Sequence, residues 1–122
     1  MAEFKSKYPV KDRRNECSRI RQKYPDRIPI ICEKSATCND TTIASITKCR
    51  YLVPNDLSAG QFMYVIRKRM KLSSDKAIFL FVGDKGSMAP SSKLLSDLYL
   101  QYKDAEDSFL YITYSGESTF GH

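Results

Sequence analysis

The residues most suited to chemistry stand at the end of the chain, where Gly121 precedes a single His122. Glycine has no side chain to shield its carbonyl, so a tail ending there can thread a narrow enzyme cleft in which its carboxyl group is activated. The apolar alternation of residues 109–114 predicts a buried strand just before residues 115–122, which we interpret as a flexible tail. The structural alternative is a frayed terminus in which the glycine has no role.

The four cysteines do not have the spacing of a metal site or a catalytic thiol. Cys17, Cys32, Cys38 and Cys49 form no Cys-x-x-Cys pair, and His122 is the only histidine. A nucleophilic cysteine needs a neighbouring base, which is usually histidine, and the sequence has no histidine before His122. We therefore expect no metal and no cofactor.

An acidic segment is the nearest approach to a catalytic carboxylate pair. It contains Asp104, Glu106 and Asp107. We interpret these three side chains as a solvated acidic loop, and we expect no enzymatic activity.

Length and composition predict one globular domain. The chain has 122 residues, of which 42% are hydrophobic and 28% are charged. No apolar run approaches the ~20 residues that a membrane span needs, and the first fifteen residues lack the apolar core of a secretory signal. We expect a cytoplasmic protein with reduced cysteines.

Charge is distributed unevenly along the chain. Residues 1–34 carry ten basic and five acidic groups, a balance of +5, whereas residues 72–122 carry four and seven, a balance of −3. Such polarity suits an acidic partner. A second hypothesis is therefore a basic adaptor for an anionic polymer, either the acidic surface of tubulin or RNA, although no nucleic-acid motif is present. The basic residues in question are Lys11, Arg13, Arg14 and Arg21.

Periodicity predicts an α+β order of elements. A short helical turn at 3–7 and a helix from Pro9 to about Lys23 precede strands at 28–33 and 48–53. The Ser58 to Gln61 capping box opens a helix that ends near Met70, and strand 77–82, loop 83–92, helix 94–102 and strand 109–114 complete the chain. This order predicts a ubiquitin-like β-grasp with a four-stranded mixed sheet and two extra N-terminal helices. We divide the chain into a helical extension (1–26), a ubiquitin-like domain (27–114) and the tail (115–122).

Five blocks of sequence stand out along the chain: KYPDRIPII at 23–31, YLVPNDL at 51–57, GQF at 60–62, IRKR at 66–69 and FLYI at 109–112. Together they resemble the GABARAP branch of autophagy-related ubiquitin-like modifiers. They run in the family's order over nearly the whole chain, from about Tyr8 to Gly121.

This resemblance implies a route to the membrane. A cysteine protease would remove His122, and activating and conjugating enzymes would pass the Gly121 acyl group to the amine of phosphatidylethanolamine. The protein would then move from the cytoplasm to the autophagosomal membrane. One diacyl lipid supplies two buried chains, which suffices for stable anchoring.

The resemblance also implies that an aromatic-x-x-aliphatic peptide of a cargo receptor or adaptor adds as a strand beside residues 48–53. By the family pattern, the aromatic pocket would use Glu16, Ile20, Pro29, Ile31, Arg50, Leu52 and Phe109. The aliphatic pocket would use Tyr51, Val53, Pro54, Leu57, Phe62 and Val65. A basic flank of Arg27, Lys48 and Arg69 would meet acidic groups of the peptide, and Phe79 and Phe81 match a secondary partner surface.

Each large apolar residue of these sets, such as Ile20, Ile31, Phe62 or Phe109, is by default a core residue when taken alone. Pro29 adds a difficulty, because proline favours a sheet edge whereas the resemblance places its strand inside the sheet. Val65 replaces the usual leucine, and loop 35–47, which holds Cys38, is about two residues longer than the family pattern.

Overall fold

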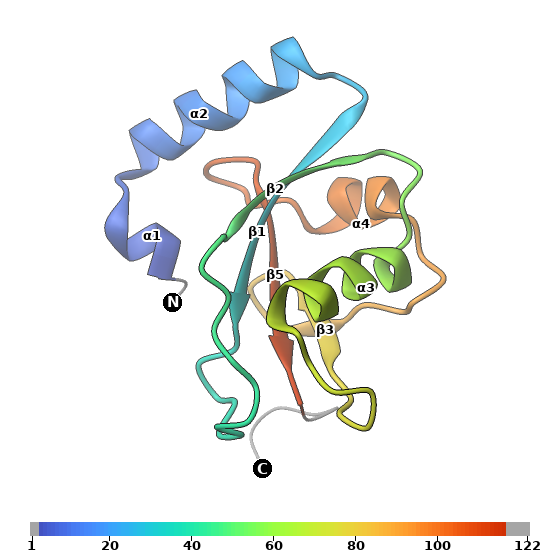
Figure 1. The fold of residues 1–122 in the computed structure, drawn as a ribbon. Coiled ribbons are helices and arrows are strands. Elements are labelled where there is room, and N and C mark those ends of the chain that lie inside the picture. Colours follow the sequence, from blue (N-terminus) through green and yellow to red (C-terminus); the bar gives the residue numbers. More distant parts are fainter. Residues whose placement is uncertain (1–2, 117–122) are drawn as a thin grey trace.

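The computed structural model describes residues 3–116, in which one mixed β-sheet separates two pairs of helices (Figure 1). This confirms the α+β class. The elements are α1 (Glu3–Lys7), α2 (Val10–Lys23), β1 (Arg27–Lys34), β2 (Arg50–Pro54), α3 (Ala59–Met70), β3 (Phe79–Val82), β4 (Ser87–Met88), α4 (Leu95–Tyr102) and β5 (Leu110–Ser115). None of the helices within residues 3–116 combines the length and apolarity that crossing a bilayer requires.

The sheet has five strands in the order β2-β1-β5-β3-β4, so the prediction of four strands was wrong. The additional strand, β4, pairs antiparallel with β3 and lies within the predicted loop 83–92. The hairpin turn has Gly83 at φ 77° and Gly86 at φ 63°, and the amide of Ala89 donates to the carbonyl of Leu80. A strand of two residues is too short to show any alternation in the sequence.

Pro29 fits the interior strand β1 because of the register. The amide of Cys32 donates to the carbonyl of Cys49 at 2.8 Å, so alternate β1 residues bond β2, and Pro29, opposite Leu52, occupies a non-hydrogen-bonded position. Its other side faces β5, but the parallel β1–β5 ladder starts only at Ile30. Neither ladder therefore needs the N–H that proline lacks.

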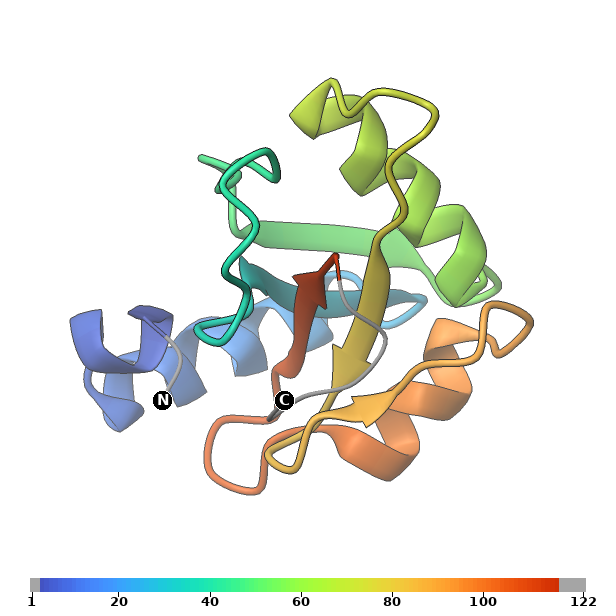
Figure 2. The ribbon, with the colours of Figure 1, turned by 90° about the horizontal axis from the view of Figure 1, so that it is seen from below.

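Helices lie on both faces of the sheet, as the view from below shows (Figure 2), and apolar side chains pack on each face. The larger cluster lies between the sheet and the helices α3 and α4, where Phe62, Ile66 and Leu95 are fully buried. The smaller cluster, on the α1 and α2 side, consists of Phe4, Cys17, Ile31 and Phe109. Strand β2 contributes Tyr51 and Val53 to the larger cluster, while its Arg50 lies over Phe4 of the smaller cluster.

The cap of α3 forms as the sequence predicts. The amide of Gln61 donates to Ser58 Oγ at 3.1 Å, and the amide of Ser58 donates to Gln61 Oε1 at 2.8 Å. This reciprocal pair satisfies two amides at the helix start and holds α3 beside β2.

The acidic segment after α4 is buried in part, which contradicts the interpretation of a solvated loop. Asp104 and Asp107 are 7% and 1% exposed. Asp104 forms an ion pair with Lys5, and Asp107 forms one with Arg13, so both carboxylates bind the N-terminal helices. Buried carboxylates need such partners, but the partners lie more than ninety residues away in the sequence.

Candidate functional site

Within the described part of the chain, residues 3–116, strand β2 forms one edge of the sheet and pairs only with β1. Because Cys32 bonds Cys49, the register turns the backbone N–H and C=O groups of Arg50 and Leu52 away from β1. These groups can accept and donate the hydrogen bonds of an added strand. The edge is therefore a template for an extended peptide.

Side chains along β2 alternate between the two faces of the sheet, as expected of a strand. Tyr51 and Val53 pack with α3 in the larger cluster, and the ring of Tyr51 meets that of Phe62 edge-on at a centroid distance of 5.4 Å. Arg50 reaches the opposite side, where it contacts α1 and α2. An added strand would thus meet one set of side chains on each face.

An ion pair joins β2 to α2. The carboxylate of Glu16 accepts from Arg50 Nε at 2.8 Å and from Arg50 Nη2 at 3.2 Å. The guanidinium of Arg50 also lies 4.8 Å from the ring centroid of Phe4 and 4.9 Å from that of Tyr8. Hydrogen bonding to Glu16 raises the pKa of Arg50.

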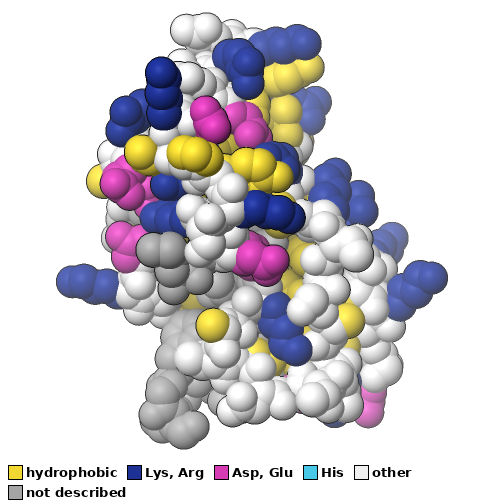
Figure 3. Space-filling model, turned by 90° about the vertical axis from the view of Figure 1, so that its left-hand side faces the viewer, with side chains coloured by type: hydrophobic (Ala, Val, Ile, Leu, Met, Phe, Trp, Pro, Cys, Tyr) yellow, Lys and Arg dark blue, Asp and Glu magenta, His cyan; other side chains and the backbone are white. Residues whose placement is uncertain are grey.

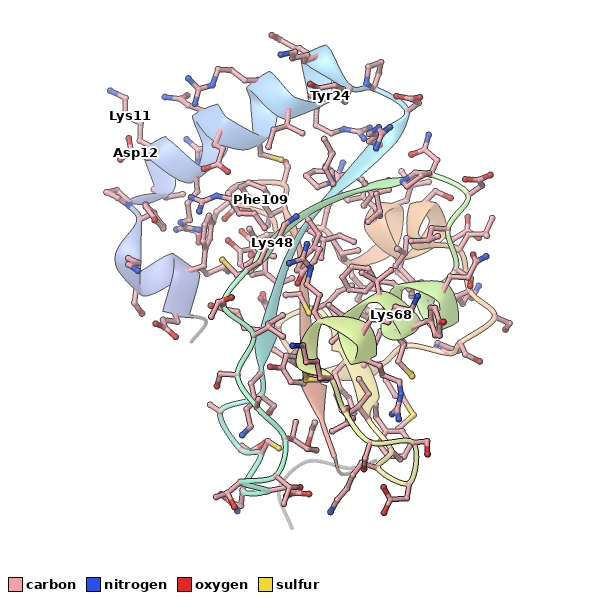
Figure 4. All side chains as sticks on the ribbon, in the orientation of Figure 1. Lys11, Asp12, Tyr24, Lys48, Lys68 and Phe109 are labelled. Carbon is pink, nitrogen blue, oxygen red and sulfur yellow. The ribbon has the colours of Figure 1, made fainter. Side chains whose placement is uncertain are left out.

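The structure places the seven residues predicted for the aromatic pocket in three groups. Ile20, Ile31 and Phe109 belong to or pack against the smaller cluster, Glu16 is paired with Arg50, and Pro29 lies opposite Leu52 in the β1–β2 ladder. Ile31, Phe109 and Pro29 are buried, whereas Ile20 and Leu52 are half-buried. Figure 4 labels Phe109 in the layer between α2 and the sheet.

Two aromatic residues, Phe4 of α1 and Tyr8 directly after it, also belong to this region, and the sequence analysis did not assign them there. Phe4 is buried against Ile31 and Phe109, and Tyr8 packs against the same cluster. The rings of Phe4 and Tyr8 lie 4.9 Å apart. Their spacing of four residues is a helical signal that could have indicated a shared apolar face.

The six residues predicted for the aliphatic pocket come together between β2 and α3. Tyr51, Val53 and Phe62 are buried, so they support the site from below. Leu57 and Val65 are half-buried at the margin of the larger cluster, and Pro54 is exposed.

The predicted basic flank divides into two places. Lys48 Nζ lies 5.1 Å and the Arg69 guanidinium 5.8 Å from the ring centroid of Tyr51, so these two cations share one ring. Arg27 pairs with Pro54 at the other end of β2. Cations therefore stand at both ends of the edge strand.

The hydroxyl of Tyr51 is buried and has no hydrogen-bond partner among residues 3–116. Burial raises the pKa of Tyr51 to about 12, so the group stays a neutral phenol.

Phe79 and Phe81 lie on β3, which is separated from β2 by β1 and β5. Their neighbours Ile78, Leu80 and Val82 belong to the larger cluster, so by alternation these two rings point to the opposite face. Phe81 is 2% exposed and Phe79 is half-buried. The structure does not bring them to the β2 edge.

Gly121 and His122 lie outside the described residues, but the start of the tail is visible at Gly116. A Cβ on Gly116 would lie 2.4 Å from Ile43 Cδ1, so loop 35–47 packs closely on this glycine. Burial opposes ionisation of Cys38 in that loop, but hydrogen bonds from the Gly116 and Asp40 amides lower the pKa of its thiol. Within residues 3–116, no three His, Cys, Asp or Glu side chains gather as a metal site.

Comparison with known proteins agrees with this geometry. The sequence model of the family described as "Autophagy protein Atg8 ubiquitin like" matches residues 12–121. Autophagy-related protein 8 of Neosartorya fischeri is 56% identical over 120 residues, which cover 98% of this chain and 97% of that protein; the protein of the same name from Colletotrichum lindemuthianum is also 56% identical, with 94% of its length covered. The crystal structure of Trypanosoma brucei ATG8 superposes with a TM-score of 0.86 at 40% identity and covers 99% of each chain.

Proposed function

Because the chain belongs to the Atg8 family of autophagy-related ubiquitin-like modifiers, we propose that it is a lipid-conjugated docking scaffold of autophagosome formation. In this proposal a cysteine protease removes His122, and activating and conjugating enzymes join Gly121 to phosphatidylethanolamine. The protein works in the cytoplasm and, once conjugated, on the autophagosomal membrane. It recruits partners and catalyses nothing itself.

The single observation that carries the docking role is the free edge of β2 with apolar surface on both of its faces. An added strand gains affinity from backbone hydrogen bonds at Arg50 and Leu52. Successive side chains of that strand alternate between faces, so an aromatic residue fits beside Leu52 while an aliphatic residue three positions later fits beside Val65. Lys48 and Arg69 favour acidic groups next to the motif.

The docking test is a titration with a tryptophan-containing aromatic-x-x-aliphatic peptide, followed by amide chemical shifts. We expect saturable shifts along β2 and a loss of affinity of at least tenfold in Leu52→Ala. Leu100→Ala is the matched control, because Leu100 is 74% exposed on α4. Equal affinity of Leu52→Ala and Leu100→Ala would contradict the proposed docking edge.

The conjugation test uses purified ligation enzymes and liposomes that contain phosphatidylethanolamine. Wild-type protein should gain the mass of the lipid after loss of His122 and float with the liposomes. Gly121→Ala should stay in solution, because a methyl group at the reacting residue obstructs a narrow cleft. Lipidation of Gly121→Ala would refute this assignment.

The second hypothesis, a basic adaptor for tubulin or RNA, gains no specific support. Arg13, one of its four cations, is 5% exposed and paired with Asp107. Basic and acidic side chains are interspersed over the α1 and α2 side of the molecule (Figure 3).

A further inference from the structure

A hollow of about 330 Å³ lies on the side of α2 that does not face β2. Three elements form it: α2, α4 and the loop that follows α4, which lies against α2 in Figure 1. Its volume stands at the lower end of the ~300–1,000 Å³ of small-molecule sites.

The α2 wall of the hollow consists of Arg14, Cys17, Ser18 and Arg21, which are spaced as one helix face. The residues predicted for peptide docking, Glu16 and Ile20, point elsewhere, since they belong to the α2–β2 side. The hollow is therefore separate from the proposed docking edge.

The two arginines are held in place by backbone carbonyls. Arg14 Nε donates to the carbonyl of Glu106 at 2.9 Å, and Arg21 Nη1 donates to that of Arg27 at 2.6 Å. The Arg21 guanidinium also lies 5.0 Å from the ring centroid of Tyr99. A guanidinium carries five N–H donors, so each retains several for a ligand while its orientation is restricted.

The remaining lining groups leave this positive charge uncompensated. Asp107 is the one carboxylate of the lining, and it already accepts from Arg13, the Tyr111 hydroxyl and the Phe109 amide. Burial raises the pKa of Cys17 to about 11 and that of Tyr99 to about 12, so both side chains are neutral. Ser18 and Ser108 add hydroxyl groups.

The spacing of the arginines determines which anion fits. The Cα atoms of Arg14 and Arg21 are seven helical residues, about 10 Å, apart. The Arg14 guanidinium is held at the carbonyl of Glu106, whereas that of Arg21 is held at the carbonyl of Arg27 and over the ring of Tyr99, so the two cations are anchored at different places. Two anionic groups joined by a short polar body match one guanidinium each, with the body beside the Ser18 hydroxyl.

We propose that this hollow binds a small hydroxylated bisphosphate, with one phosphate at Arg14 and the other at Arg21. This site goes beyond the docking and conjugation functions and does not depend on them. A ligand there would tie α2 to the loop after α4.

The test is a titration of the full-length protein with fructose 1,6-bisphosphate, monitored by amide chemical shifts and calorimetry. We expect saturable shifts at Arg14, Ser18, Arg21 and Ser108. Fructose 6-phosphate should bind about tenfold more weakly, and fructose should not bind. Absence of saturable shifts at these amides, or equal affinity for the mono- and bisphosphate, would overturn the proposal.

Variants make the assignment specific. Arg14→Gln and Arg21→Gln should each weaken binding about tenfold, whereas Arg19→Gln, an exposed arginine of the same helix, should change it less than twofold. Ser18→Asp adds a carboxylate at the exposed midpoint and should abolish binding without removing a contact of the fold. Equal losses of affinity in Arg19→Gln and Arg21→Gln would show that only the net charge matters and would refute the site. Leu52→Ala should bind the bisphosphate with the affinity of the wild type.

Discussion

Glu16 and Arg50, thirty-four residues apart in the chain, are joined by two hydrogen bonds that tie α2 to the edge strand. The side chain of Arg50 is 45% exposed and that of Glu16 26%. Water therefore screens the pair, so it contributes little to the free energy of unfolding. The pair matters because it connects α2 to the edge strand β2.

We expect the coupling between these two side chains to be small. A double-mutant cycle with Glu16→Gln and Arg50→Met should give a coupling free energy below about 1 kcal/mol. Urea unfolding of the four proteins measures it. A coupling above about 2 kcal/mol would mean that the pair is far less solvated than its exposure indicates.

The Lys5–Asp104 pair should make stability depend on acid pH. Although burial opposes ionisation, hydrogen bonding to Lys5 and to two amides lowers the pKa of Asp104 from its ordinary value of 3.8. The stabilisation is therefore complete above pH 3.8 and is lost as the pH falls through the lower, folded-state pKa.

Asp104→Asn should accordingly be less stable than the wild type at pH 7 but show a flatter decline below about pH 4. Unfolding free energies measured across this range decide the matter. Asp84→Asn is the control, because Asp84 lies 4.0 Å from the same Lys5 Nζ but its side chain is 88% exposed. If the free energy of unfolding fell equally steeply below about pH 4 in Asp104→Asn and in the wild type, the prediction would be contradicted.

Tyr51→Phe should leave the free energy of unfolding unchanged or raise it by up to about 1 kcal/mol, since it removes a buried hydroxyl without a partner among the described residues. Tyr114→Phe is the opposite case, because the hydroxyl of Tyr114 donates to the carbonyl of Ala44 and accepts from the amide of Ile46. That change should cost about 1–3 kcal/mol. Thermal and urea unfolding of the pair would reveal the contrast, and equal losses in both would contradict it.

Val65→Leu should strengthen peptide docking about fourfold. Val65 is half-buried beside the proposed aliphatic pocket, and one added methylene contributes about 0.8 kcal/mol when buried. Calorimetry with the docking peptide measures the gain. A peptide with alanine at its aliphatic position should gain nothing, and an equal gain with both peptides would place the effect outside the pocket.

Local patterns in the sequence determined most of the secondary structure. The capping box at Ser58 and Gln61 and the alternation of residues 109–114 depend on neighbours within a few positions, which is why they could be predicted. The family was likewise readable from blocks of sequence, and the family model matches residues 12–121, the range in which those blocks lie.

Tertiary structure decided what depends on distant partners. From the sequence, Asp104 and Asp107 were interpreted as part of a solvated loop. Their partners Lys5 and Arg13 lie near the other end of the chain, so no local pattern indicated the ion pairs. The role of Pro29 required the register of two ladders, and no local pattern contains a register. Burial and strand pairing are set by contacts between remote segments, so the chain had to be folded before they could be known.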